Sequence, residues 1–357
     1  MNAFKVLTID GGGIKGLYPA RILRNFEAAI RKKHGDETRI VDYVDLICGT
    51  STGGLIALAL ALRIPAEIIC AFYEKHGPLI FRGSQGFLAR FRQTLFKGKF
   101  SDRILRAALV ELFKNSTMGE SHCLLCIPYY NFTHGTYGVF KFDHKEGDLR
   151  KHNKLTMVDV ALATSAAPTF FPLAQIERDN EIMGQYVDGG VWANNPALVG
   201  FLEAIWHFVG SGKPYDHVEL LSLACLNYGT GKSPLLKRRR SFLQWAPDLF
   251  DLGLIGQSEF THMFLDRIAR QNSFPLAYSR IPSAEVAPHQ TQFIKLDYAD
   301  NESLTLMRQF ADAMYDRFRK DLQIVKFFET KKTYITNQSP SSKLQTAAQP
   351  KEKSSST

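Results

Sequence analysis

The sequence lacks several features that would each define a class of protein. Its longest apolar runs span about eight residues, whereas a helix that crosses a membrane needs about 20, so no transmembrane segment is predicted. Its five cysteines are an odd number scattered over apolar segments, and we expect them to be reduced and buried. Cys123 and Cys126 form a C-x-x-C pair, but no second pair completes a zinc site. We therefore expect neither a metal nor a cofactor.

No secretion signal precedes the first predicted strand, which starts almost at Met1. Apolar residues make up 45% of the chain and charged residues 22%, which is typical of a globular protein. A chain of 357 residues can bury a full core in one or two domains. These properties predict a cytoplasmic protein.

Two glycine-framed turns lie within the first sixty residues, each between an apolar strand-like run and a helix-like run. The second turn, G-T-S-T-G-G starting at Gly49, matches G-x-S-x-G, in which the serine occupies the apex of a sharp strand-to-helix turn. Gly49 and Gly53 suit this turn because strand and helix pass close together there. Ser51 is therefore the candidate nucleophile, and the alternative is a glycine-rich turn with an incidental serine.

The first turn, D-G-G-G-I-K-G starting at residue 10, supplies backbone N–H groups. A carbonyl attacked by Ser51 would become a tetrahedral oxyanion, which preorganised N–H donors stabilise. Gly11, Gly12 and Gly13 can turn their amides toward a ligand because no side chain intervenes. They form the predicted oxyanion hole, and Lys15 adds positive charge nearby.

The same turn also matches G-x-G-x-x-G, the fingerprint of dinucleotide-binding domains. That fingerprint requires an acidic residue at the end of the second strand, roughly 20 residues beyond the glycines. Asp36 stands at that distance but within a polar loop, and the next predicted strand leads into Ser51 instead. A non-enzymatic module that binds a dinucleotide through Gly11–Gly16 is one alternative function.

A third motif, Asp188-Gly189-Gly190, follows the short run Q-Y-V. A serine needs a base to act as a nucleophile at neutral pH. A carboxylate can serve if it lies within hydrogen-bond reach and is partly desolvated, because burial raises its pKa. Asp188 is the candidate base, although an aspartate beside glycines is by itself an ordinary turn residue.

These motifs, in this order, resemble those of the patatin-like phospholipases. The segments Thr164–Pro172 and Asn194–Pro196 resemble further parts of that family, and the similarity spans residues 4–231. The resemblance implies a Ser–Asp dyad without histidine or metal, in which Ser51 is the nucleophile and Asp188 its base. It also implies that Gly11–Gly13 are the oxyanion glycines and that acyl esters of phospholipids and galactolipids are hydrolysed.

An α/β-hydrolase esterase with a Ser–Asp–His triad is the alternative with the same chemistry. That fold needs a histidine after the acidic residue. Among the histidines beyond Asp188, His289 stands in a plausible loop. However, the first glycine turn begins with Asp10, where the oxyanion loop of that fold would carry a histidine.

Within the family, the chain most resembles bacterial effector phospholipases of cyclic-oligonucleotide antiphage systems, through residues 40–49, 64–69 and 72–81. This resemblance implies activation by a cyclic di- or oligonucleotide in antiviral defence, with an unregulated lipid acyl hydrolase as the alternative. A phosphate-rich activator needs cationic and stacking partners. Such residues occur in 82–106 and in Lys237–Arg240 beside Trp245. Whether copies of the chain form a homo-oligomer stays open.

The net charge of +9 is concentrated in part in residues 82–106, where phenylalanines alternate with basic residues. A basic, aromatic segment suits the anionic headgroups of membrane phospholipids, which would place the protein peripherally at the inner membrane face. It also suits nucleic-acid phosphates. Alternatively, it is a solvated segment whose phenylalanines dock on the core.

Strand-like and helix-like patterns alternate along the chain, which predicts a three-layer α/β fold around a mainly parallel sheet. We expect helices over 17–33, 102–114 (capped by Ser101) and 303–328, and neighbouring strands over 123–132 and 137–142. Active groups should lie at the carboxyl ends of the strands. Residues 1–231 form the predicted catalytic core, 232–330 a helical C-terminal layer or lid of the same domain, and 331–357 a disordered tail.

Overall fold

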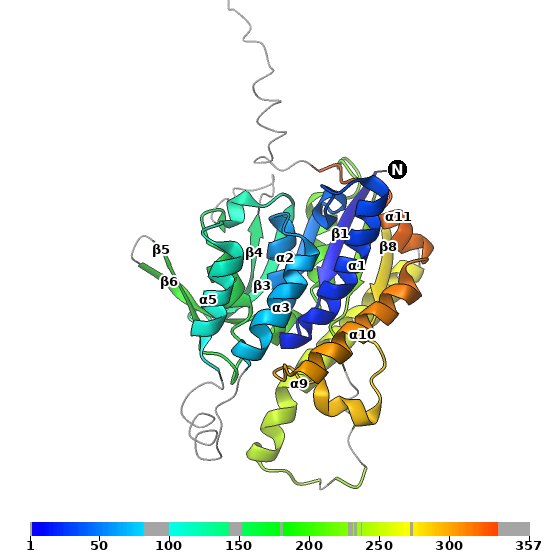
Figure 1. Ribbon diagram of the computed structural model, residues 1–357. Helices are drawn as coiled ribbons and strands as arrows, with labels where there is room; N and C mark the ends of the chain where they lie inside the picture. Colours follow the sequence, from blue (N-terminus) through cyan, green and yellow to red (C-terminus); the bar gives the residue numbers. More distant parts are fainter. Residues whose placement is uncertain are drawn as a thin grey trace, which may run out of the picture.

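The computed structural model describes residues 2–81, 100–142, 152–178, 181–227, 231, 234–236, 238–271 and 274–334. In this part of the chain, one eight-stranded sheet lies between two layers of helices (Figure 1). The predicted α/β fold is confirmed.

The sheet is parallel at its centre and antiparallel at one side. Its strand order is β5-β6-β3-β2-β1-β7-β8, and β4 pairs with β3. The five strands β3, β2, β1, β7 and β8 run parallel to one another. By contrast, β4 and β6 run antiparallel to β3, and β5 runs antiparallel to β6. The strands are β1 (Ala3–Ile9), β2 (Leu46–Gly49), β3 (Leu124–Asn131), β4 (Thr136–Phe142), β5 (Ala174–Arg178), β6 (Glu181–Asp188), β7 (His217–Leu223) and β8 (Leu276–Ile281).

Alternating side chains of the strands supply two hydrophobic cores, one on each face of the sheet. On β1, Leu7 and Ile9 enter the larger core and Phe4 and Val6 the smaller one. The larger core is covered by α1, α2, α3, α5, α6 and α10, and the smaller one by α8 and the second half of α9. The helices are α1 (Leu17–His34), α2 (Thr52–Ala61), α3 (Ala66–Ile80), α5 (Asp102–Phe113), α6 (Met157–Thr164), α7 (Gly190–Ala193), α8 (Ala197–His207), α9 (Phe242–Arg270), α10 (Asn301–Phe318) and α11 (Leu322–Phe327).

Short 3₁₀ turns complete the secondary structure at the ends of strands and helices. They are η1 (Gly13–Gly16), η2 (Ile40–Tyr43), η3 (Met118–Glu120) and η5 (Pro288–Phe293). Ser101 caps α5 as predicted, because its hydroxyl accepts a hydrogen bond from the Arg103 N–H at 3.2 Å. Among the described residues, no helix combines the length and the apolarity that a membrane crossing requires.

The strands β2 and β6 lie along the same edge of β3 and point toward each other. The parallel strand β2 pairs with residues 124–126 of β3, and the antiparallel strand β6 pairs with residues 129–131, while β4 occupies the opposite edge. Asp188 stands at the carboxyl end of a strand, as expected, and that strand runs antiparallel to β3. The carboxyl ends of β2 and β6 therefore face one another across Ile127 and Pro128, which brings the residues that follow them together.

The C-terminal part of the chain differs from the predicted helical layer. It adds a strand, β8, which pairs in parallel with β7, so residues beyond 232 complete the sheet itself. The single helix expected over 303–328 is two helices, because Asp321 caps a new one by accepting hydrogen bonds from the Gln323 and Ile324 N–H groups. The predicted tail begins later than residue 331, since Tyr334 is buried and its N–H bonds Asp45 at 2.9 Å. Residues 335–357 lie outside the described chain.

Two further sequence predictions have partial outcomes. All five cysteines are buried and free, as expected. Most of the basic segment 82–106, residues 82–99, lies outside the described residues. In its remainder, Phe100 is buried against Phe81 and Phe171, and Arg106 pairs with Asp159 at 3.1 Å. The described end of this segment therefore docks on the core.

Candidate active site

Ser51 occupies the sharp turn between β2 and α2. Its backbone has φ 55° and ψ −123°, a left-handed conformation that a residue with a side chain rarely adopts. A Cβ atom on Gly49 would lie 2.1 Å from the Gly53 carbonyl oxygen, and one on Gly53 would lie 2.2 Å from the Ile9 carbonyl oxygen. Both positions therefore require glycine, as the motif predicts.

Hydrogen bonds from neighbouring elements fix this turn. The Ser51 N–H donates to the Thr164 hydroxyl at 3.1 Å, and that hydroxyl donates to the Pro128 carbonyl at 2.7 Å. The Thr50 hydroxyl donates to the Ala193 carbonyl at 2.6 Å. The serine turn is thus tied both to β3 and to the turn that follows Asp188.

Asp188, the last residue of β6, lies close to Ser51, whose side chain acts to lower the pKa of the Asp188 carboxylate. The Asp188 carboxylate accepts a hydrogen bond from the Gly190 N–H at 2.7 Å, and Asp188 is 2% exposed. Gly189 allows this tight turn, because a Cβ there would lie 2.3 Å from the Pro128 carbonyl oxygen. Burial raises the pKa of Asp188 to about 7, although Ser51 and the bond from Gly190 oppose the shift.

Ser51 and Asp188 line a cavity of about 70 Å³ with mostly apolar walls. Its walls include Leu55, Phe72, Tyr73, Ile80, Phe81, Leu105, Phe170, Phe171, Leu254 and Leu296. An apolar cavity beside a hydroxyl and a carboxylate suits a substrate with a hydrocarbon chain and a reacting polar group. We call it the acyl cavity.

The glycine turn after β1 forms one wall of the acyl cavity through Gly12 and Gly13. Gly13 has φ 59°, and a Cβ on it would lie 2.3 Å from the Leu296 carbonyl oxygen. The Gly11 N–H instead donates to the Asn194 carbonyl at 2.9 Å. Of the three glycines predicted to supply oxyanion donors, Gly11 therefore has its amide engaged with Asn194 in this structure.

Lys15 lies on the other side of the glycine turn, in a second cavity of about 220 Å³. Gly12 borders both cavities, but Lys15 borders the second one and is buried there. Burial lowers its pKa, although Cys225 and Asp251 oppose that effect. The positive charge predicted beside the oxyanion glycines is thus separated from Ser51 by the turn itself.

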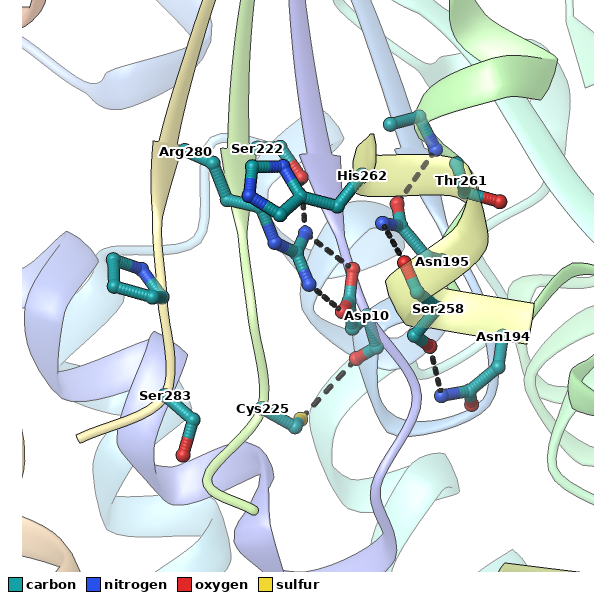
Figure 2. Close-up of polar contacts among 12 residues, drawn as sticks. Asp10, Asn194, Asn195, Ser222, Cys225, Ser258, Thr261, His262, Arg280 and Ser283 are labelled. Atoms are coloured by element: carbon teal, nitrogen blue, oxygen red, sulfur yellow. Dashed lines mark hydrogen bonds and ion pairs between the residues drawn. The ribbon is translucent and has the colours of Figure 1, made fainter. Parts of the chain in front are cut away.

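The second cavity contains an ion pair that sequence reasoning missed. Arg280 of β8 donates to both oxygens of Asp10, at 2.6 and 3.3 Å, and to the Ser222 hydroxyl at 2.6 Å (Figure 2). Burial alone would lower the pKa of Arg280, but Asp10 outweighs it and raises the pKa above its usual value. The pair anchors the residue that immediately precedes the glycine turn to β7 and β8.

Helix α9 also reaches this region and holds the two asparagines that follow α7. The Asn194 amide donates to the Ser258 hydroxyl at 2.9 Å, and the Asn195 amide donates to the Ser258 carbonyl at 3.2 Å (Figure 2). A motif pointed to these asparagines, whereas no motif marks Ser258 or Arg280. Their partners are 58 to 270 residues away in the chain, so local patterns carry no signal for them.

The structure weighs against both alternative sites. Among the described residues that line the acyl cavity there is no histidine, and His289 is exposed in η5. Asp36 is exposed in the turn after α1 and does not stand at the end of a strand. In the described part of the chain, no group of three or more His, Cys, Asp or Glu side chains is placed to hold a metal ion.

A strained serine between strand and helix, beside a buried carboxylate and an apolar cavity, is typical of hydrolases that act on esters. The family described as patatin-like phospholipase matches residues 7–201, and the chain belongs to this family. It is thereby a lipid acyl hydrolase. The matched region holds Ser51 and Asp188 but ends before α9 and β8.

Individual relatives agree with this assignment. The chain is 33% identical to a protein of Pseudomonas aeruginosa named cGAMP-activated phospholipase, over 76% of this chain and 78% of the relative. It is 31% identical to a protein of the same name from Vibrio cholerae, over 64% of each chain. It is 30% identical to patatin-like protein 3 of Arabidopsis thaliana, over 63% of this chain and 58% of the relative. The chain therefore spans less than two thirds of the latter two relatives.

Proposed function

We propose that the protein hydrolyses fatty-acyl esters of membrane glycerophospholipids through a dyad of Ser51 and Asp188. The observation that carries this proposal is that Ser51 lines the same apolar cavity as the buried carboxylate of Asp188, whose pKa burial raises to about 7. A carboxylate with that pKa is ionised in about half of the molecules at neutral pH and accepts a proton more readily than an exposed aspartate.

In the first step, the Ser51 Oγ attacks the ester carbonyl while its proton passes to Asp188. The oxyanion that forms would be stabilised by the amides of Gly12 and Gly13, which border the cavity. Collapse of this intermediate breaks the ester bond. The lysophospholipid leaves with the proton from Asp188, and the acyl group remains on Ser51.

In the second step, a water molecule attacks the acyl-enzyme while Asp188 accepts one of its protons. The second oxyanion collapses, the fatty acid leaves, and the proton returns from Asp188 to Ser51. The apolar walls of the acyl cavity hold the hydrocarbon chain and reduce the access of water to the carboxylate. Both steps balance without a metal or a cofactor.

Substitution of Ser51 tests this proposal. Ser51→Ala should lower phospholipid hydrolysis by on the order of 10⁴-fold and should abolish labelling by a fluorophosphonate probe, because no nucleophile remains. Thr52→Ser, which changes a neighbouring hydroxyl, is the matched control and should keep the label. Labelling of Ser51→Ala at the wild-type rate would overturn the proposal.

We further propose that a cyclic nucleotide activates the enzyme. Support comes from the two bacterial relatives, whose names state activation by cGAMP. An enzyme that cleaves the membrane of its own cell also needs an inactive state. The second cavity is a poor site for such an activator, because Asp10, Asp251 and Glu259 there outnumber Lys15 and Arg280, and phosphates require a cationic surface.

Hydrolysis of a fluorogenic ester, measured with and without a panel of cyclic di- and oligonucleotides, tests the regulation. An activator must bind the active state more tightly, and a shift from 1:99 to 99:1 requires about 5.5 kcal/mol of differential binding. We expect one member of the panel to raise the rate. Full activity without any nucleotide, unchanged on addition, would leave an unregulated lipid hydrolase.

A further inference from the structure

Helix α9 is apolar on two opposite faces. Its inner face packs on the protein through Leu254 and Leu265, which are 8% and 0% exposed. Its outer face carries large apolar residues that are all exposed: Trp245, Leu249, Leu252, Phe260 and Met263. These five positions follow one another at intervals of 3, 4 or 8 residues, which keeps them on one side of a helix with 3.6 residues per turn.

An apolar stripe of this length is unusual on the surface of a globular protein. One apolar face suffices to attach a helix to its core, and exposed apolar patches mark sites of interaction. Leu235 and Leu236, which precede α9 in the chain, are exposed as well, Leu235 to 91%. We therefore expect the outer face of α9 to bind something other than the core of the protein.

The beginning of this stripe is positively charged. Arg238 and Arg239 are exposed directly before α9, and the Arg240 guanidinium lies 4.7 Å from the centre of the Trp245 ring. Arginine beside tryptophan and leucine is the combination found where a helix rests in the headgroup region of a bilayer. The charge complements anionic lipid, and the apolar side chains complement the acyl boundary below it.

The same part of α9 adjoins the acyl cavity. Leu252 lies on the outer stripe, and Leu254, two residues later, lines the acyl cavity beside Ser51 and Asp188. In Figure 1 the first part of α9, drawn in yellow-green, extends beyond the end of the sheet toward which the arrow of β1 points. A bilayer against this part of α9 would therefore lie near the cavity that takes the acyl chain.

We propose that the first half of the α9 stripe (Trp245, Leu249 and Leu252), together with Arg238–Arg240, is the surface that docks the protein on an anionic bilayer. This inference rests on the proposed function, because it names the surface through which the hydrolase reaches its lipid. It differs from the expectation for residues 82–106, since α9 lies elsewhere in the chain and supplies its own apolar and basic residues.

Binding to vesicles tests the surface without any need for turnover. Ser51→Ala protein is mixed with vesicles of phosphatidylcholine alone or with phosphatidylglycerol, and the bound fraction is measured by sedimentation. In this background, Leu249→Asp/Leu252→Asp should weaken binding by about tenfold or more, because two apolar side chains no longer enter the lipid. Leu322→Asp, at an exposed leucine of α11, is the matched control and should bind normally.

The basic residues should act through charge. Arg238→Glu/Arg239→Glu should lower binding to the anionic vesicles more than to the neutral ones, and added salt should reduce that difference. With Ser51 restored, Leu249→Asp/Leu252→Asp should slow hydrolysis of vesicle phospholipid by about tenfold while hydrolysis of a soluble short-chain ester stays normal. Thermal melting of each variant confirms that the fold is retained.

Several outcomes would overturn the inference. Normal vesicle binding by Leu249→Asp/Leu252→Asp would exclude the stripe as the docking surface. If this variant instead dissociates a dimer on analytical ultracentrifugation and still binds vesicles, the stripe is an interface between two copies of the chain. If vesicle binding depends on the stripe but the protein with Ser51 intact hydrolyses no ester with any member of the cyclic-nucleotide panel, the docking surface stands and the proposed function is rejected.

Discussion

Two buried aspartates flank the glycine turn, Asp10 in the second cavity and Asp188 in the acyl cavity. Both stand at the end of a strand, and both are at most 3% exposed. Asp10 faces the guanidinium of Arg280, with which it shares two hydrogen bonds. Asp188 faces a serine hydroxyl and a backbone N–H, and its pKa rises to about 7. Burial raises the pKa of both carboxylates, and the two differ in their neighbours: Arg280 opposes this shift at Asp10, whereas a serine and a backbone N–H oppose it at Asp188.

The different neighbours of Asp10 and Asp188 also suit the two carboxylates to different roles. A carboxylate that accepts two hydrogen bonds from a buried arginine holds a fixed position, so Asp10 can fix the start of the glycine turn. A carboxylate without a cation changes its protonation state easily, so Asp188 can act as a base. The four predictions that follow test this division, beginning with the largest expected effect.

Asp188→Asn should remove nearly all hydrolysis, because an amide cannot accept the proton of Ser51. A loss on the order of 10³-fold or more in kcat is expected, with the fold retained. Asp10→Asn is the matched control in the other cavity and should leave the chemical step far less affected. If Asp188→Asn kept nearly normal turnover, Asp188 would not be the base.

Arg280→Met should destabilise the protein strongly, because Asp10 would be left as an unpaired buried charge. The expected loss is about 3–5 kcal/mol in the free energy of unfolding, measured by urea denaturation. The double variant Asp10→Leu/Arg280→Met removes both charges and should regain most of this stability. If the double variant were no more stable than Arg280→Met, charge pairing would not be the reason for the loss.

The pH dependence of kcat/KM should report the raised pKa of Asp188. Its base function requires the ionised form, so the rate should rise by about tenfold per pH unit below pH 7 and level off above it. Hydrolysis of a soluble ester between pH 5 and 9 measures this profile. Asp10 lies in the second cavity, where it pairs with Arg280, so its ionisation should not appear as a second step in this profile. A profile that is already flat at pH 5 would contradict the pKa shift.

The sequence predicted the parts of this site that depend on local backbone geometry. Gly49, Ser51 and Gly53 form a recognisable turn because steric constraints act within five neighbouring residues. Asp188 was identified by its motif, but the antiparallel direction of β6 was not, since strand pairing depends on residues more than 50 positions away. For the same reason, the neighbouring sequence does not predict the hydrogen bond of Gly11 to Asn194 or that of Arg280 to Asp10.

Asp188→Asn should also make the protein more stable at high pH, an effect smaller than the preceding ones. In the unfolded chain this aspartate ionises near its usual pKa of 3.8, whereas in the folded protein it ionises only at about 7. Wild-type protein therefore loses stability as the pH rises from about 4 to about 7. Asparagine has no charge to bury, and its amide can keep the bond to Gly190.

The difference in unfolding free energy between Asp188→Asn and wild type should accordingly be a loss at pH 4, rise by about 4 kcal/mol up to about pH 7 and stay constant above it. We expect a gain on the order of 2 kcal/mol, less than the full value of the pKa shift, because the amide hydrogen bonds only partly replace those of the carboxylate. Urea denaturation of both proteins at several pH values measures it. Asp10→Asn should show the opposite sign, a loss of stability, because it breaks the pair with Arg280. A stability difference for Asp188→Asn that does not change with pH would mean that this carboxylate is no harder to ionise in the folded protein than in the unfolded chain.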